Sequence, residues 1–343
     1  MTDFTDIEVR ILNHIQHSFP LVRRPFSAIG SCLDLPESKV MATIRGLKNR
    51  GIIRNIAAIF NPRRLGYAMG LVGMAIADSQ VDQAASIIND HPGVSHNYLR
   101  DHHFNIWFTL AEESKDRFSE SVDALTRAVG ASDTLILKTE KVFKIGVKLD
   151  VGEQTAKNEE KLETASLSAH DNGKPTGDEK EGIVLLQKDL PVVEKPFSAL
   201  VVQHNGLISE DQLLKMAASL QKKGFMRRYA AVLRHMKAGF THNAMTVWKP
   251  QGHGMSVLDA FLREDAVSHL YNRTIYPGKW EYPLFAMIHA KSDKTLADIV
   301  QRLSRESGIT DYQVLHSLRE LKKQRVVYFS DEFEQWHHSN SGG

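Results

Sequence analysis

Apolar residues recur at helical spacing through the first fifty residues of the chain. They predict three helices, over residues 7–17, 27–33 and 39–50. Thr5 or Asp6 can cap the first helix and Ser27 the second. Gly51 follows the third, where glycine commonly ends a helix. With the apolar segment 52–60 as a hairpin wing, this order predicts a winged helix-turn-helix.

Beyond residue 60 the pattern becomes one of short apolar runs separated by amphipathic stretches. The runs predict strands and the stretches predict helices, in the order strand, helix, strand, strand, helix, strand. The predicted elements cover residues 68–77, 81–89, 94–100, 105–110, 116–129 and 134–147. This order predicts a ferredoxin-like unit.

The second half of the chain repeats this plan after a polar segment rich in Glu, Lys, Asn, Ser and Gly, which predicts a flexible linker. Helices are expected over 183–190 and from Ser209 to Lys223, and a wing over 224–233. The second ferredoxin-like unit is expected to use residues 244–248, 255–263, 267–273, 284–289, 296–307 and 326–329. Residues 312–323 are expected to be helical or irregular.

The predicted fold class is therefore α+β, with a tandem repeat of a winged helix-turn-helix and a ferredoxin-like βαββαβ unit. The predicted domains are 1–60 (helix-turn-helix), 61–151 (ferredoxin-like), 152–180 (linker), 181–235 (helix-turn-helix), 236–335 (ferredoxin-like) and 336–343 (disordered tail).

The strongest sign of the repeat is the pattern His-x-Tyr-x-Arg, which occurs twice at an offset of 173 residues. Its residues are His96, Tyr98 and Arg100 in the first copy and His269, Tyr271 and Arg273 in the second; Val-Ser precedes each. In a strand, alternate residues share one face. An imidazole, a phenol and a guanidinium on one face are unsuited to a core, so each copy is expected to line a cleft.

Composition adds limits rather than a function. The 343 residues carry a net charge of only +2, which gives no electrostatic argument for nucleic acid. One cysteine, Cys32, excludes an internal disulfide and a cysteine-built metal site within one chain. There is no signal-like apolar segment at the start and no apolar run long enough to cross a membrane, so a cytoplasmic protein is expected.

Several segments resemble those of known families. The joint between the first two units, Phe60-Asn61-Pro62-Arg63-Arg64-Leu65-Gly66, resembles that of the leucine-responsive regulator (Lrp/AsnC) architecture. Finer details look like siroheme decarboxylase, a family built on that architecture. The segments that carry this likeness are residues 227–235, 239–248, 269–273 with Tyr276-Pro277, and 318–323.

The resemblance implies a fused two-subunit form, with one subunit in residues 1–150 and the other in 180–335, that acts as a pseudo-heterodimer within one chain. It also implies the removal of CO₂ from two acetate side chains of siroheme. The expected partners are siroheme and its mono- and didecarboxylated products, and further oligomers or homologous subunits are possible. No cofactor beyond the substrate's own iron tetrapyrrole and no metal site made by side chains is expected. The product, didecarboxysiroheme, would feed heme d1 or alternative heme synthesis.

Siroheme carries eight carboxylates, so a site for it needs many cations, and arginine binds carboxylates bidentately. The predicted substrate-binding residues are Arg54, Arg63, Arg64, Arg100, Arg227, Arg228, Arg234, Arg273, His235, His242, Trp248 and Tyr276. His96 and His269 are the predicted catalytic residues, because their unperturbed pKa lies near neutrality. Tyr98 and Tyr271 would assist them by hydrogen bonding.

Two other functions stay open on sequence. One is an Lrp/AsnC-type transcription regulator that reads DNA through residues 38–50 and 209–223; the other is a non-catalytic heme sensor. DNA binding is disfavoured, because Glu210 and Asp211 stand at the start of the second helix, where base-reading side chains would lie and where phosphates would repel acids.

Overall fold

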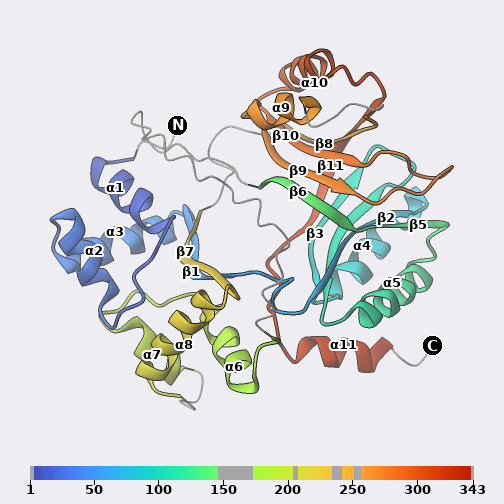
Figure 1. The fold of residues 1–343 in the computed structure, drawn as a ribbon. Helices are drawn as coiled ribbons and strands as arrows, with labels where there is room; N and C mark the ends of the chain where they lie inside the picture. The colour runs from blue at the N-terminus through green and yellow to red at the C-terminus, as the bar shows by residue number, and fades with distance from the viewer. Residues whose placement is uncertain (1–3, 146–172, 204–207, 234–241, 251–255, 341–343) are drawn as a thin grey trace.

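The structure is a computed structural model that describes residues 4–145, 173–203, 208–233, 242–250 and 256–340. It has two lobes (Figure 1). One lobe holds the helices at the start of each half together with a two-stranded sheet. The other holds a nine-stranded sheet and the helices packed on it.

The helical lobe contains both helix-turn-helix units. Its helices are α1 (Asp6–Ile15), α2 (Pro25–Leu33), α3 (Glu37–Asn49), α6 (Gly177–Leu186), α7 (Pro196–Val202) and α8 (Glu210–Lys222). The predicted caps Thr5 and Ser209 are confirmed, since each side chain accepts a hydrogen bond from the backbone N–H three residues on. The predicted cap Ser27 is wrong: it lies inside α2, which begins at Pro25, a residue that suits the first helical turn.

The predicted hairpin wings are also wrong. Each half contributes one strand, β1 (Ile53–Phe60) or β7 (Met226–Leu233), and the two pair antiparallel with each other. Neither segment contains a turn sequence that would fold it back on itself. The partner strand comes from the other half, so this two-stranded sheet joins the two helix-turn-helix units.

The sheet lobe confirms the predicted tandem of ferredoxin-like units. The first unit has strands β2 (Ala68–Ala75), β3 (Val94–Arg100), β4 (Ile106–Glu112) and β5 (Asp133–Leu137), with helices α4 (Val81–Asp90) and α5 (Lys115–Val129); a short 3-10 turn, Asp78–Gln80, precedes α4. The second unit has strands β8 (His242–Trp248), β9 (Val267–Arg273), β10 (Leu284–Ala290) and β11 (Tyr312–Lys323), with helices α9 (Ser256–Arg263) and α10 (Asp293–Ser307). The one remaining strand of the nine-stranded sheet is β6 (Thr139–Ile145), which lies at one edge. The strand order of this sheet is β5-β2-β4-β3-β11-β8-β10-β9-β6.

The two halves exchange the ends of their last strands. The predicted single strand over 134–147 is two strands, because β6 leaves its own half and pairs with β9 of the other. Residues 312–323, expected to be helical or irregular, form the long strand β11, which pairs with β8 and then with β3. The predicted strand over 326–329 is wrong, since these residues are not in a strand. Leu315, Leu318 and Leu321 recur every three residues, which imitates helical spacing, but pairing with two neighbouring strands overrides it.

Three apolar cores lie in the sheet lobe. Helices α4 and α5 cover the outer face of the first unit, and α9 and α10 cover that of the second. The inner faces of the two units meet in a shared core that includes Trp107, Trp280 and Phe285. The two halves are therefore joined by paired strands and by a common apolar core.

The C-terminal prediction needs correction. Residues 332–340 form helix α11 (Glu332–Asn340) rather than part of a disordered tail. Phe333 is buried, the Trp336 ring lies 4.1 Å from the His91 ring, and His337 Nε2 is 3.1 Å from Glu112 Oε1. These contacts hold α11 against the first half of the chain, and its mostly polar sequence does not indicate them.

The predicted linker, 152–180, is too long at its end, because α6 begins at Gly177, with Thr176 as its cap. Residues 152–172 lie outside the described part of the chain. Among the helices that the structure describes, none is both long and apolar enough to cross a bilayer.

Candidate active site

The two motif strands are β3 and β9, and each carries a β-bulge directly before its histidine. The register skips Ser95 in β3 and Ser268 in β9. A bulge re-aims side chains. It lets the valine before each serine pack in the outer core while the serine hydroxyl reaches the next residue's imidazole. The Val-Ser pair that precedes both motifs thus has a structural reason.

His96 lies in a mixed electrostatic environment. Its Nδ1 is 3.1 Å from Ser95 Oγ, and Ser95 Oγ is 2.7 Å from Thr109 Oγ1. Burial lowers the pKa of His96, and the nearby cations Lys323 and Arg54 lower it further, while Glu320 opposes them. Lys323 is the strand partner of His96, so the other half supplies this charge.

Tyr98, two residues on, donates a hydrogen bond to Glu320 Oε2 at 3.3 Å. Burial raises the pKa of Tyr98, and the carboxylate of Glu320 raises it further. The phenol therefore stays protonated near neutral pH and acts as a donor.

His269 has a different set of neighbours. Its Nδ1 is 2.8 Å from Ser268 Oγ, and that hydroxyl is 2.9 Å from Nε2 of a second histidine, His289. The His269 ring stacks near the Tyr271 ring, with centroids 5.9 Å apart. Burial raises the pKa of Tyr271, while Arg273, Arg227 and Arg63 oppose the rise. The charged groups that shift the pKa of Tyr271 are thus all cations, whereas Tyr98 faces the carboxylate of Glu320.

The two motif arginines are deeply buried. Arg100 Nη1 donates to the Leu315 carbonyl (2.9 Å) and to Ser317 Oγ (3.0 Å). In the same way, Arg273 Nη1 donates to the Leu137 carbonyl (3.2 Å) and to Thr139 Oγ1 (2.9 Å). Each arginine therefore bonds to a strand of the other half.

Burial lowers the pKa of both Arg100 and Arg273 to about 10. Each guanidinium lies near the ring of its motif tyrosine, and its Nε has no hydrogen-bond partner in the part of the chain that the structure describes. These residues hold the two halves together beneath the motif faces.

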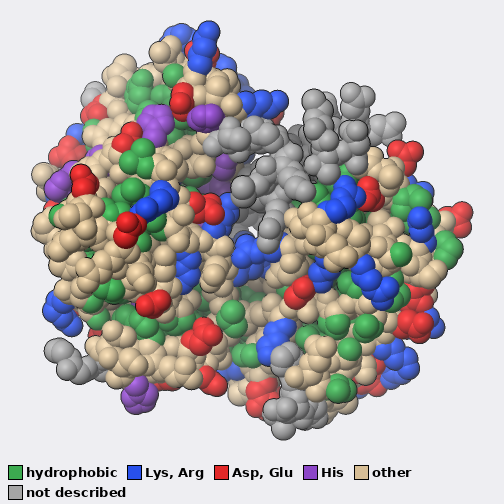
Figure 2. Space-filling model, turned by 180° about the vertical axis from the view of Figure 1, so that it is seen from behind, with side chains coloured by type: hydrophobic (Ala, Val, Ile, Leu, Met, Phe, Trp, Pro, Cys, Tyr) green, Lys and Arg blue, Asp and Glu red, His purple; other side chains and the backbone are tan. Residues whose placement is uncertain are grey.

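More accessible cations surround the motif strands. Figure 2 shows Lys and Arg side chains gathered along a hollow between the two lobes. Arg54 Nη2 lies 3.4 Å from the Lys323 carbonyl, and Arg63 Nη2 donates to the Thr139 carbonyl at 3.0 Å. The positive charge of Arg227 lowers the pKa of Tyr271, and that of Arg228 lowers the pKa of Arg325.

Arg325 and Lys323 belong to this group, and neither was predicted from the sequence. Burial lowers the pKa of Arg325, and the positive charges of Arg54 and Arg228 lower it further. The basic residues at the end of β11 are a sequence pattern that indicates a cationic surface. Only the pairing of β11 with β3 brings that surface next to His96.

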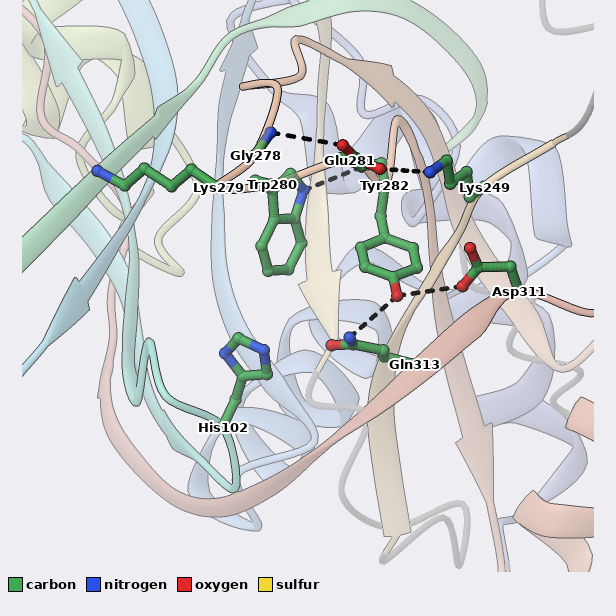
Figure 3. A pocket seen from close by; sticks show the side chains of 9 residues that line it. All are labelled: His102, Lys249, Gly278, Lys279, Trp280, Glu281, Tyr282, Asp311 and Gln313. Carbon is green, nitrogen blue, oxygen red and sulfur yellow. Dashed lines mark hydrogen bonds and ion pairs between the residues drawn. The ribbon is translucent and has the colours of Figure 1, made fainter.

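Two cavities lie apart from the motif histidines. One, of about 220 Å³, is formed beside the aromatic turn that follows β9 (Figure 3). There Trp280 and Tyr282 face His102 and Gln313, and Tyr282 donates to Asp311 Oδ1 at 3.1 Å. The second, of about 520 Å³, lies near the end of β3 and is lined in part by Arg100 and Leu318. Neither lining includes His96 or His269.

Known proteins match this chain along nearly its whole length. Residues 8–54 match the model of the siroheme decarboxylase NirDL-like helix-turn-helix domain, and residues 64–144 and 237–322 match the AsnC-like ligand-binding domain. The siroheme decarboxylase of Hydrogenobacter thermophilus is 36% identical over 95% of this chain and 96% of its own length. The chain belongs to the siroheme decarboxylase family.

Other members of the family are similar in different ways. The siroheme decarboxylase alpha subunit of Desulfovibrio desulfuricans is 38% identical over 43% of this chain and 84% of its own length. The beta subunit from Oleidesulfovibrio alaskensis is 32% identical over 45% of this chain and 97% of its own length. The structure of the siroheme decarboxylase NirDL in co-complex with an iron-uroporphyrin III analogue has a TM-score of 0.77 and 32% identity, and covers 97% of each chain. Two-subunit members of the family thus correspond to parts of this single chain.

Several residues predicted for the family's site lie elsewhere. Trp248 is fully buried between the sheet and α9, with its indole N–H donated to Thr246 Oγ1, so its prediction as a substrate contact is wrong. His242 shares that helix-facing side of β8 and lies 3.8 Å from Asp293 of α10, away from the motif face.

Two further predicted residues make contacts within the protein. Arg64 donates to the Lys223 carbonyl at the end of α8 (3.4 Å), which suits a cation at a helix C-terminus. Tyr276 donates its hydroxyl to the Ile136 carbonyl (2.8 Å) and fixes the aromatic turn to the other half. Arg234 and His235 lie outside the described residues.

The helix-turn-helix cations of this family member are engaged within the protein. Lys48 of α3 lies 2.8 Å from Asp189, and Arg45 donates to the Val192 carbonyl at 2.7 Å. Arg23 pairs with Asp211 in the first turn of α8, with an Nη2–Oδ2 distance of 2.6 Å. Side chains that a DNA-reading helix would offer to phosphates instead join one helix-turn-helix unit to the other.

Proposed function

We propose that this chain removes CO₂ from two acetate side chains of siroheme and releases didecarboxysiroheme. The observation that carries the proposal is the similarity to a siroheme decarboxylase over 95% of the chain. The neighbouring structure with an iron-uroporphyrin analogue supports a tetrapyrrole with many carboxylates as the ligand. The two halves act as a pseudo-heterodimer, since each contributes one motif strand and exchanges a strand with the other.

The cations beside the motif strands suit such a ligand. Four of the eight arginines predicted to bind substrate are Arg54, Arg63, Arg227 and Arg228. Among the described residues, none of these four forms an ion pair with a carboxylate. Six other arginines do form one: Arg23, Arg24, Arg50, Arg117, Arg302 and Arg319. Each charge-assisted hydrogen bond to a substrate carboxylate contributes about 1.5–3 kcal/mol, so several together offset its loss of hydration.

The histidines supply the proton that the reaction needs. When the bond between the methylene carbon and the carboxylate breaks, CO₂ leaves and its electron pair remains on the methylene carbon, where the macrocycle delocalises it. In our proposal Nε2 of His96 or His269 donates a proton to that carbon, which becomes a methyl group. Tyr98 and Tyr271 donate hydrogen bonds beside them.

Acid catalysis of this kind accounts for roughly 10²–10⁴-fold of the rate. Enzymes typically reach 10⁶-fold or more, so desolvation of the carboxylate and delocalisation in the ring must supply the rest. Arg100 and Arg273, predicted as substrate ligands, serve in this proposal as supports that fix the two motif strands.

Anaerobic incubation with siroheme, followed by mass spectrometry, tests the proposal. The expected product has lost two CO₂ units. His269→Ala should abolish or strongly slow this loss, whereas His338→Ala, at an exposed histidine on α11, should not. Unchanged siroheme with the wild-type chain would refute the proposed activity.

A further inference from the structure

The serine and the second histidine behind His269 form a chain of hydrogen bonds with no equivalent in the first half. His269 Nδ1, Ser268 Oγ and His289 Nε2 follow one another at 2.8 and 2.9 Å, and the Met287 carbonyl is a more distant acceptor for Ser268 Oγ at 3.3 Å. In the first half, Ser95 bonds instead to Thr109 at 2.7 Å, and the residue at the position of His289 is Ala111. A hydroxyl ends one chain and a titratable imidazole ends the other.

The bulge in β9 makes this chain possible. Ser268 is almost fully buried, with 3% of its surface exposed, while His269 and His289 are partly exposed. His289 lies on β10 at an alternate position to Met287, the strand partner of His269, so both imidazoles are on the inner face of the sheet. A backbone hydrogen bond from His289 N to the Ala266 carbonyl (3.0 Å) fixes this end of the strand. The two partly exposed imidazoles are therefore connected through a buried hydroxyl.

We propose that Ser268 and His289 are positioning residues that deliver protons to His269. This inference rests on the proposed function. Each decarboxylation leaves a carbanion that must gain one proton. A neutral imidazole that gave up its Nε2 proton alone would become an imidazolate, which is very unfavourable. The hydrogen-bonded chain avoids this charge.

The proton balance is as follows. Protonated His289 gives its Nε2 proton to Ser268 Oγ, Ser268 gives its hydroxyl proton to Nδ1 of His269, and His269 gives its Nε2 proton to the methylene carbon. His269 and Ser268 remain neutral, His289 becomes neutral, and the substrate carbon becomes a methyl group. Water then reprotonates His289, and His269 returns to its first tautomer after the product leaves. Each CO₂ released consumes one proton from water.

The first half lacks such a donor. Ser95 and Thr109 can orient His96, but neither takes up a proton near neutral pH. The two motif histidines are therefore unequal, and His269 is the one whose proton is renewed through the protein while substrate covers the site.

The test uses the full-length chain with siroheme under anaerobic conditions. His289→Gln keeps a side chain that can donate a hydrogen bond but cannot carry the proton. We expect it to lower kcat by about tenfold or more, as a share of the effect of an acid catalyst, with KM nearly unchanged, and added imidazole should restore the rate. Ser268→Ala should lower kcat similarly, and imidazole should restore less of the loss because the buried hydroxyl is missing.

Thr109→Val is the matched control in the first half. It removes a hydroxyl from the equivalent chain, and the rate of this variant should not respond to imidazole. Binding of iron uroporphyrin, followed by absorbance, checks that each variant keeps a folded site. If His289→Gln does not bind it, Ser268→Ala alone carries the test.

The outcomes separate the two proposals. A wild-type chain that releases no CO₂ overturns both. Activity in the wild type, loss of activity in His269→Ala and a normal kcat in both His289→Gln and Ser268→Ala overturn the proton delivery alone. A raised KM with no rescue by imidazole would assign these residues a purely structural role and would also overturn it.

Discussion

Replacing Arg273 by methionine should leave the stability of the protein almost unchanged although the side chain is only 8% exposed. Burial lowers the pKa of Arg273 to about 10. This is roughly 2.5 pH units below the ordinary value, and each unit corresponds to about 1.4 kcal/mol. Keeping the guanidinium charged in the fold therefore costs ~3 kcal/mol. The arginine is charged in both the folded and the unfolded chain at neutral pH, so this cost applies at every pH below about 10.

Methionine removes that cost but also removes two hydrogen bonds, to the Leu137 carbonyl and to Thr139 Oγ1. A buried acceptor left without a donor costs about 1–3 kcal/mol. The two effects nearly cancel, so we expect the free energy of unfolding to change by less than ~2 kcal/mol. Arg100→Met, at the equivalent residue, should behave in the same way, because its burial, pKa and bonding match.

Urea unfolding followed by circular dichroism measures this change. Arg63→Met is the matched control: Arg63 is exposed, and its loss should hardly affect stability but should weaken the binding of iron uroporphyrin by about tenfold or more. A destabilisation of Arg273→Met by ~3–5 kcal/mol would refute the reasoning, since a loss of that size is typical of a buried charge with a true counter-charge.

Three further predictions concern the sheet lobe. Trp280→Ala should lower the free energy of unfolding, measured in urea, by ~3–5 kcal/mol, because the ring is only 3% exposed and lies in the core between the halves. Tyr276→Phe removes one exposed hydrogen bond and should lower it by less than about 1 kcal/mol; an equal decrease in the two variants would contradict this reasoning. Burial lowers the pKa of His91, and hydrogen bonds from His91 and Ser121 outweigh burial and lower the pKa of Glu112. Because both groups bind protons more weakly in the folded protein than in the unfolded chain, the free energy of unfolding falls as pH falls through and below their ordinary pKa values. Tm should therefore fall steadily from pH 7 to pH 4, and a constant Tm would contradict this. Gly93→Ala should lower Tm markedly, since the added Cβ would overlap the Ala111 carbonyl oxygen. The added Cβ of Gly130→Ala meets no neighbouring atom, so that variant should be destabilised only by the backbone strain of its positive φ.

The sequence predicted those parts of the fold that depend on local pattern. Each ferredoxin-like order follows from apolar runs and amphipathic stretches, and the caps Thr5 and Ser209 follow from their own side chains. The pairing of β1 with β7 and the exchange of β6 and β11 depend on which strands meet in space. Hydrophobic spacing carries no information on that choice.

The same limit applies to the candidate site. The repeated motif predicted that His96 and His269 lie on strands, because alternation within a strand is local, and the structure confirms this; their catalytic role stays a prediction. The motif gave the buried arginines the wrong neighbours, since Leu137 and Leu315 come from the other half. His289 and Lys323 could not be predicted from the motif, because each lies on a strand adjacent to the motif strand rather than within it.

The exchange of strands has a consequence for how this protein can change over generations. On one side His269 pairs with Ile145 and His96 pairs with Lys323, so each histidine has one strand neighbour encoded in the opposite half of the gene. Recombination that replaced one half would alter both sites at once. Substitutions at these strand pairs must therefore be compatible across the two halves.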